Sequence, residues 1–289
     1  LGLAWDFGPD RADGCLACIP MCQSERFPRY RHILRQLIDE RVVYPCECTR
    51  SQIASQSASA PHESSWDLLE GPVYPGTCRK RWESSSEPFE FTSTLRPALR
   101  WALELGTMRW HDQLLGQQEA TPLKHLGDFV IARGNGDPSY HLAVVVDDFE
   151  MGVNEVVRGD DLVLSTYRQQ AILRHLDWPS PRYYHVPLVV GPDGQRLAKR
   201  DGDSLKHMRR QGMTPEQIVG YLAFSAGLMD RPEKVRAFEL LDLFDWSKFR
   251  KQSSAFQRTG QKNDSTDPLP YRRILSHQSI VSVTLSAAC

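Results

Sequence analysis

The loop at 191–200, Gly-Pro-Asp-Gly-Gln-Arg-Leu-Ala-Lys-Arg, places Arg196, Lys199 and Arg200 just beyond a tight turn. The β-forming residues 186–190 precede this loop, so the cations would lie at the end of an apolar strand. Phosphoryl chemistry depends on positioning and charge neutralisation more than on covalent help from the protein, and cations on such a loop suit it. A solvated basic turn explains the same residues, because runs of charge usually lie on the surface.

Residues 140–148 are Tyr-His-Leu-Ala-Val-Val-Val-Asp-Asp, a short run with β-branched residues that is followed by two carboxylates. Such a run is typical of a strand buried on both faces of a parallel sheet, so we expect a strand over 139–146. Ligands of parallel sheets bind at the carboxyl ends of strands, where Asp147 and the segment Arg158-Gly-Asp would lie. A solvated strand end is the alternative for Asp147 and Asp148.

Three cysteines have the spacing of a metal site. Cys46 and Cys48 are separated by one residue, and Cys78 follows a turn at Gly76. Tetrahedral zinc prefers thiolate and imidazole ligands, and the paired spacing favours such a site. The alternative is that these cysteines are buried as small hydrophobic residues.

A second cysteine group, Cys15, Cys18 and Cys22, has C-x2-C-x3-C spacing. His32 is the nearest residue along the chain that could be recruited as a fourth ligand. Chance thiols explain this group equally, because no further ligand accompanies it.

Tyr140, Arg158-Gly-Asp and Arg196-Leu-Ala-Lys-Arg, taken together and in this order, resemble the catalytic half of a class I aminoacyl-tRNA synthetase of the glutamyl type. The last segment stands where that class has its Lys-Met-Ser-Lys-Ser-like signature. Here Arg196 replaces the first lysine, and Ala198 replaces the usual serine.

Two further segments extend the resemblance. Residues 44–50, Tyr-Pro-Cys-Glu-Cys-Thr-Arg, and residues 73–79, Val-Tyr-Pro-Gly-Thr-Cys-Arg, look most like the glutamyl-Q tRNA(Asp) synthetases, the short paralogues of the glutamyl-tRNA synthetases. The resemblance covers roughly residues 1–230.

The resemblance implies roles for five residues. Tyr140 and Arg158 match the positions that hold the substrate glutamate, and a guanidinium suits a carboxylate through charge-assisted hydrogen bonds. Lys199 matches the second lysine of the signature loop, which meets the phosphates of ATP and is the expected catalytic residue. Arg196 and Arg200 are expected to join it in binding ATP.

Each glutamate-binding residue has a structural alternative. Arg158 could instead form an ion pair with Asp160 or Glu155. Tyr140 could be a core aromatic residue whose hydroxyl has found a partner.

The resemblance also implies a Zn²⁺ site of Cys46, Cys48, Tyr74 and Cys78, since the glutamyl-Q enzymes carry Cys-x-Cys and Tyr-x3-Cys. The expected fold is α/β, a Rossmann-type synthetase catalytic domain with a zinc-binding insertion. The expected divisions are the remainder of the first Rossmann half at 1–45, the insertion at 46–125, the second Rossmann half at 126–190, the signature loop and a helical connection at 191–245, and a poorly ordered or aberrant tail at 246–289.

The implied reaction is ATP-dependent activation of glutamate, followed by transfer of the glutamyl group to queuosine of tRNA(Asp). The expected partners are glutamate, tRNA, and ATP with Mg²⁺. The protein is expected to be a monomer in the cytoplasm. Within the class, the alternative is a fragment of glutamyl-tRNA synthetase. The alternative from another class is a non-catalytic protein that binds zinc and RNA.

The start of the chain resembles the family only from just after its His-x-Gly-His and Arg-Ile-Glu-Asp segments, which do not occur here. We therefore expect a fragment that lacks the first βαβ unit. Residues 1–289 alone are expected to show little exchange between ATP and pyrophosphate.

The amino-acid composition narrows the classes of protein to which this chain could belong. The 289 residues are 40% hydrophobic, which indicates a globular chain. No apolar run approaches the roughly 20 residues that span a bilayer, so no membrane partner is expected. The seven cysteines come without a leader that would suggest a disulfide framework. A net charge of −1 means that any surface for RNA must be locally basic, at 196–210 or 248–273.

Helices are expected to position these groups. Residues 25–42 have apolar side chains at helical spacing, with Pro28 in the first turn. A helix is expected over 165–176, and another after Thr214, where Gln217 completes a capping box.

Overall fold

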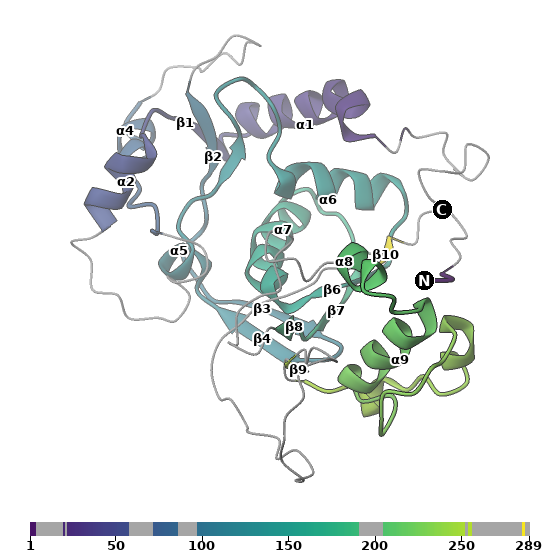
Figure 1. The fold of residues 1–289 in the computed structure, drawn as a ribbon. Helices are drawn as coiled ribbons and strands as arrows, with labels where there is room; N and C mark the ends of the chain where they lie inside the picture. Colours follow the sequence, from purple (N-terminus) through teal and green to yellow (C-terminus); the bar gives the residue numbers. More distant parts are fainter. Residues whose placement is uncertain are drawn as a thin grey trace.

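The computed structural model describes most of the chain between residues 22 and 251 (Figure 1). The described residues are 1–3, 20, 22–57, 72–85, 97–190, 205–251, 254–255 and 285–286, the last two pairs by backbone alone. The predicted ATP-binding loop at 191–200 lies outside these residues, and so do Cys15 and Cys18.

The predicted helix near the start is confirmed as α1, Phe27–Asp39, which follows the short 3-10 helix η1, Gln23–Arg26. Pro28 lies in its first turn, where a missing backbone N–H costs no hydrogen bond. Four side chains at helical spacing are buried in the largest core cluster: Tyr30, Ile33, Leu34 and Leu37.

An antiparallel sheet of three strands lies beside this helix. Its order is β1 (Val43–Cys46), β2 (Ala98–Trp101) and β5 (Val130–Ala132). Cys46 faces Ala98 across the first pair, so the chain between β1 and β2 leaves and re-enters the sheet at neighbouring positions. That excursion carries the helices α2, Arg50–Ser57, and α4, Thr77–Glu83.

A second sheet is mixed, with the order β10-β6-β7-β3-β4. Strand β7 is parallel to both neighbours, β6 and β3, whereas the outer pairs are antiparallel. The crossover from β6 to β7 contains a helix, as parallel neighbours require. The bounds are β3 Met108–Asp112, β4 Gly116–Ala120, β6 Glu155–Gly159, β7 Arg182–Val186, β10 Leu285–Ser286 and, in the crossover, α7 Val163–His175. The predicted α/β class is confirmed.

The strand predicted over 139–146 is wrong, because this segment forms the helix α6, Tyr140–Glu150. The side chain of Ser139 caps the helix by accepting a hydrogen bond from the backbone N–H of Leu142. The buried positions 142, 143, 145, 146 and 147 follow helical rather than alternating spacing. Burial against α7 and the first sheet therefore overrides the strand preference of three consecutive valines.

Asp147 and Asp148 consequently lie in the last turn of a helix, not at the end of a strand. Asp147 is buried and accepts hydrogen bonds from Arg26 at 2.6 Å and from Tyr30 at 2.7 Å. It therefore ties α1 to α6, which is a structural role.

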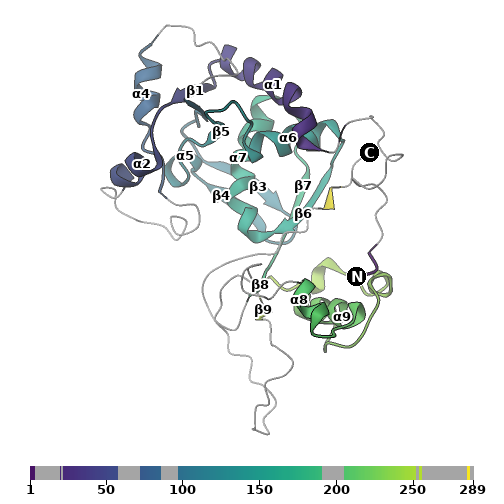
Figure 2. The same ribbon diagram turned by 45° about the horizontal axis from the view of Figure 1, so that its top comes forward.

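The remaining elements include α9, Pro215–Ala226, where the predicted capping box of Thr214 and Gln217 is confirmed. Figure 2 shows α8 and α9 grouped apart from the two sheets. The other bounds are α5 Pro122–His125, η2 Asp160–Leu162, β8 Val189–Val190, α8 Leu205–Arg210, η4 Ala237–Leu240, η5 Trp246–Lys248 and β9 Ser254–Ala255.

Among the described residues, no helix is both long and apolar enough to cross a bilayer. The predicted division at 125, between the insertion and the second Rossmann half, stays a prediction. Strands β3 and β4 precede this position, yet they belong to the same sheet as β6 and β7, which follow it. Most of the predicted tail at 246–289 lies outside the described residues.

Candidate active site and metal centre

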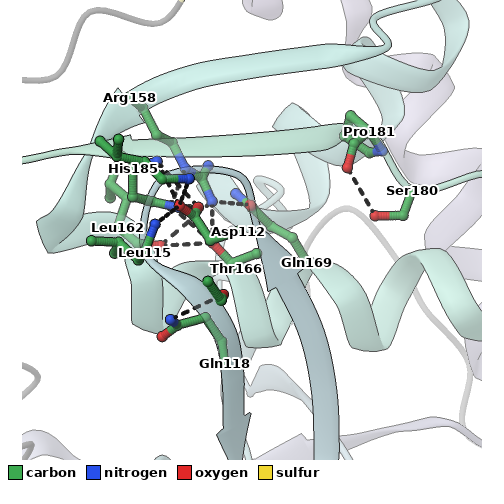
Figure 3. A network of polar contacts seen from close by, with 12 residues as sticks. Asp112, Leu115, Gln118, Arg158, Leu162, Thr166, Gln169, Ser180, Pro181 and His185 are labelled. Atoms are coloured by element: carbon green, nitrogen blue, oxygen red, sulfur yellow. Dashed lines mark hydrogen bonds and ion pairs between the residues drawn. The ribbon is translucent and has the colours of Figure 1, made fainter. Parts of the chain in front are cut away.

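Arg158 lies near the carboxyl end of β6, as predicted, with only 2% of its surface exposed. Figure 3 shows its side chain within a network of buried polar groups. Nε donates to the ring of His185 at 3.1 Å. Nη2 donates to Thr166 Oγ1 and to Gln169 Oε1, both at 2.7 Å. Nη1 takes part in none of these bonds.

His185 in turn contacts Asp112, and both side chains are fully buried. His185 Nδ1 lies 2.6 Å from Asp112 Oδ2, and the backbone N–H of His185 donates to the same oxygen at 3.1 Å. Burial opposes ionisation of Asp112, but its hydrogen bonds to His185 and to the backbone of Leu114 and Leu115 lower its pKa. Burial and the nearby Arg158 lower the pKa of His185.

The guanidinium of Arg158 is thus a buried cation whose hydrogen-bond partners are all uncharged. The alternative of a structural ion pair is not seen in the described part of the chain. Glu155 pairs with Arg182 at 2.5 Å instead, and no ion pair joins Arg158 to Asp160 there. A buried charge that forms no direct ion pair is costly, so the site is suited to an anionic ligand.

Tyr140 begins α6 and is 47% exposed, so the alternative of a core aromatic residue is wrong. Its phenol is close enough to Arg158 for that cation to act on its pKa. Partial burial nevertheless raises the pKa of Tyr140 above its usual value, which keeps the hydroxyl protonated and able to donate. The structure therefore brings Tyr140 and Arg158 together.

A cavity of about 180 Å³ lies beside this network, between α6, α7 and the starts of β6 and β7. Asp148, Gln169 and Tyr183 line it. Burial raises the pKa of Asp148 to about 7. Within the described part of the chain, the buried Nε2 of Gln169 has no hydrogen-bond partner. These groups give the cavity a partly polar wall, and Gln169 also accepts a hydrogen bond from Arg158.

The predicted metal ligands also come together. Tyr74 Oη lies 3.5 Å from Cys46 Sγ and 3.9 Å from Cys48 Sγ, and the sulfurs of Cys48 and Cys78 are 3.5 Å apart. Two sulfurs bound to one tetrahedral zinc lie about 3.8 Å apart, and a bound sulfur and oxygen about 3.5 Å. The donor set and its spacing therefore fit zinc.

The surroundings act differently on the ligands of this centre: they lower the pKa of Cys78 and raise the pKa of Cys48 and of Tyr74. Burial opposes ionisation of Cys78, but hydrogen bonds from Tyr74 and from the backbone of Glu47 lower its pKa to about 7. Burial and the neighbouring Cys78 raise the pKa of Cys48 to about 11, so Cys78 ionises first. Arg100 donates to Cys46 Sγ at 3.2 Å and lies 3.8 Å above the ring of Tyr74. This cation offsets part of the negative charge that three thiolates bring to a divalent ion.

Gly127 allows the segment with Tyr74 to pack closely on the rest of the protein. Its φ of +64° favours glycine, and a Cβ there would lie 2.9 Å from the backbone oxygen of Tyr74. The position of this ligand therefore depends on a residue far from the cysteines in sequence.

Two members of the rival cysteine group, Cys15 and Cys18, lie outside the described residues. Cys22 is exposed and lies 3.1 Å from Ser24 Oγ, and His32 is exposed on α1. In the described part of the chain, the cysteines that cluster are Cys46, Cys48 and Cys78.

Sequence reasoning missed Asp112, Thr166, Gln169 and His185. A signal existed for Asp112 and His185, because burial alternates along β3 and β7 and places these two residues on buried positions. Alternation alone does not show that the two strands are neighbours.

Comparisons with known proteins agree with this arrangement. Residues 1–261 match the family described as tRNA synthetases class I (E and Q), catalytic domain. A glutamyl-Q tRNA(Asp) synthetase of Symbiobacterium thermophilum is 45% identical over 87% of this chain and 76% of its own length. One from Rhodopirellula baltica is 39% identical over 91% of this chain and 80% of its own length.

Glutamate–tRNA ligases match less of their own length. Glutamate–tRNA ligase 2 of Halorhodospira halophila is 35% identical over 88% of this chain, which spans 51% of that protein. A crystal structure of a glutamate tRNA ligase from Elizabethkingia meningosepticum, in complex with its amino acid, shares the fold with a TM-score of 0.61 at 22% identity. The match covers 83% of this chain, which spans about half (52%) of that structure.

Proposed function

Because this chain belongs to the class I tRNA synthetases of the E and Q type, we propose that it activates glutamate with ATP and transfers the glutamyl group to tRNA. A carboxylate oxygen of glutamate attacks the α-phosphorus of ATP, and the bond to the pyrophosphate leaving group breaks. The products are glutamyl-adenylate and pyrophosphate. The acceptor nucleoside then takes the glutamyl group, and AMP leaves.

The observation that carries this proposal is the buried guanidinium of Arg158, whose hydrogen-bond partners in the described chain are uncharged. A carboxylate of glutamate supplies the missing negative charge and accepts from Nη1. The protonated hydroxyl of Tyr140 can donate to the same substrate. Charge-assisted hydrogen bonds of this kind are about twice as strong as neutral ones.

Queuosine of tRNA(Asp) is the acceptor that the relatives favour. Four relatives named glutamyl-Q tRNA(Asp) synthetase are between 39% and 45% identical to this chain, which spans 68% to 80% of their length. The glutamate–tRNA ligases are 34% to 36% identical, and the chain spans about half (48–51%) of each. The short, glutamyl-Q type is therefore the better match on both measures.

The test uses the full-length gene product. We expect exchange of labelled pyrophosphate into ATP that depends on glutamate, and then transfer of labelled glutamate to tRNA(Asp) that contains queuosine but not to tRNA(Asp) that lacks it. Transfer to tRNA(Glu) would instead support a glutamyl-tRNA synthetase. Absence of exchange from folded, zinc-loaded protein would support a non-catalytic zinc- and RNA-binding protein.

Lys199, Arg196 and Arg200 lie outside the described residues and are proposed here as contacts to the phosphates of ATP and its Mg²⁺. Their support is the resemblance of the loop to the family signature together with the family match across it. The monomeric state and the cytoplasmic location of the protein stay predictions.

The metal proposal is one Zn²⁺ held by Cys46, Cys48, Tyr74 and Cys78. Its support is the cluster of three sulfurs, whose ligand atoms lie within 4.8 Å of one another, with the phenol beside them. Four protein ligands close the coordination shell, so zinc would stabilise this part of the fold and take no part in the reaction.

Purified protein is expected to contain about one equivalent of zinc per chain, because the four donors match a structural site. The double variant Cys46→Ser with Cys78→Ser should lose that zinc and melt at a lower temperature, as measured by atomic emission and calorimetry. Cys22→Ser is the matched control and should keep it, since Cys22 is exposed and outside the cluster. Zinc that persists in the double variant but is lost from Cys22→Ser would place the metal at the rival cysteine group.

A further inference from the structure

His185 lies between a carboxylate and the guanidinium that is proposed to bind glutamate. Arg158 Nε donates to Nε2 of His185 at 3.1 Å, so that nitrogen carries no proton. The proton of a neutral ring is then on Nδ1, where it is donated to Asp112 Oδ2 at 2.6 Å. Figure 3 shows the three side chains and the hydrogen bonds between them.

The three residues come from three neighbouring strands. Asp112 ends β3, His185 lies on β7, and Arg158 lies on β6, directly opposite His185 in the parallel pairing. All three are at least 98% buried, so water does not compete for these hydrogen bonds. The strand register therefore fixes the position of the ring, and the ring fixes one edge of the guanidinium.

We propose that His185, oriented by Asp112, is a positioning residue that holds Arg158 with its Nη1 edge toward the carboxylate of the substrate glutamate. This inference rests on the proposed function. Thr166 and Gln169 hold Nη2, and His185 holds Nε, so the plane of the guanidinium is fixed by anchors on two of its nitrogens. Loss of the Nε anchor frees the group to rotate and weakens glutamate binding.

The same geometry makes binding sensitive to acid. A second proton on His185 would place an N–H at Nε2, facing the N–H of Arg158, and would add a like charge 3.1 Å away. The groups that face the ring are Asp112 from β3, Arg158 from β6, Thr166 from α7, and the aromatic rings of Trp110 and Tyr183. Asp112 favours the added proton, whereas burial and Arg158 oppose it, and the pKa of His185 is lowered on balance. The neutral, binding-competent ring therefore prevails at neutral pH and is lost as the pH falls through that lowered pKa.

Two variants separate the two hydrogen bonds of the ring. The amide nitrogen of His185→Asn can donate to Asp112 in place of Nδ1, but it leaves Arg158 Nε without an acceptor. The amide oxygen of His185→Gln reaches the position of Nε2 and accepts from Arg158. We expect the KM for glutamate to rise roughly 10-fold or more in His185→Asn and by less in His185→Gln, with the KM for ATP unchanged in both.

The controls distinguish positioning from folding. His175→Asn alters a partly exposed histidine that pairs with Glu40 and should leave both KM values unchanged. A merely structural role for His185 predicts a lower melting temperature and less active protein, with the same KM for glutamate in both variants. The unmodified protein should also show a KM for glutamate that rises at acid pH while the KM for ATP does not follow it.

Three outcomes would overturn the inference. An unchanged KM for glutamate in folded His185→Asn, while the unmodified protein exchanges pyrophosphate with glutamate, would refute the positioning role and leave the proposed function intact. Absence of that exchange in the unmodified, full-length gene product would refute both. Nitrogen NMR of the histidine rings gives a readout without activity: a proton on Nε2 of His185 at neutral pH contradicts the inference in either case.

Discussion

Lys199→Ala is expected to lower the kcat of adenylate formation by roughly 10²–10³ in the full-length gene product, with a smaller change in the affinity for ATP. Negative charge builds on the phosphates as pyrophosphate leaves, so the ammonium group stabilises the transition state more than bound ATP. Pre-steady-state adenylation with saturating glutamate measures this difference.

Arg196→Ala and Arg200→Ala are the controls from the same loop. Arg196 stands where the family has lysine, and Arg200 adds to the general positive field, so each should reduce kcat less than Lys199→Ala does. A raised KM for ATP with unchanged kcat in Lys199→Ala would limit this residue to ground-state binding.

Arg158→Ala is expected to reduce kcat/KM for glutamate by about 10- to 150-fold, the effect of losing a charge-assisted hydrogen bond of roughly 1.5–3 kcal/mol. Glutamate-dependent exchange between ATP and pyrophosphate is the measurement, with calorimetry to establish folding. Because the alanine leaves the ring of His185 without its donor, Arg158→Lys serves as a second variant that keeps the charge but loses the planar fork. The kcat/KM of Arg158→Lys for glutamate should lie between that of the unmodified protein and that of Arg158→Ala.

Arg182→Ala is the matched control for this prediction. Arg182 lies on β7 and pairs with Glu155 on the surface, so its removal should leave the kinetics for glutamate unchanged. Native kinetics in folded Arg158→Ala would remove Arg158 from the glutamate site.

Much of the site could be predicted because it depends on short segments. The spacing of Cys46, Cys48 and Cys78 indicated a metal centre, and the structure brings their sulfurs together. Arg158 was expected at the end of a strand, and β6 ends one residue later. In both cases the chemistry and the local element can be read within a few neighbouring residues.

The segment 139–146 shows where local patterns fail. Valine-rich sequence favours strands, but a local serine cap and the burial of one helical face favour the helix, and that burial depends on tertiary packing. The support of Arg158 could not be predicted for a related reason. Asp112 and His185 are 73 residues apart, and only the parallel pairing of β3 with β7 makes them neighbours.

The excursion that carries the proposed zinc ligands begins at Cys46 and returns at Ala98, which face each other across an antiparallel pair of strands. Since the sheet holds both ends, each doubling of the length between them costs only about 0.6 kcal/mol more in closure entropy. The side chains that hold Arg158 come instead from β3, β7 and α7, all outside this excursion. In evolution, therefore, the length and the cysteines of the excursion are free to diverge among relatives while selection on the proposed glutamate pocket continues unaltered.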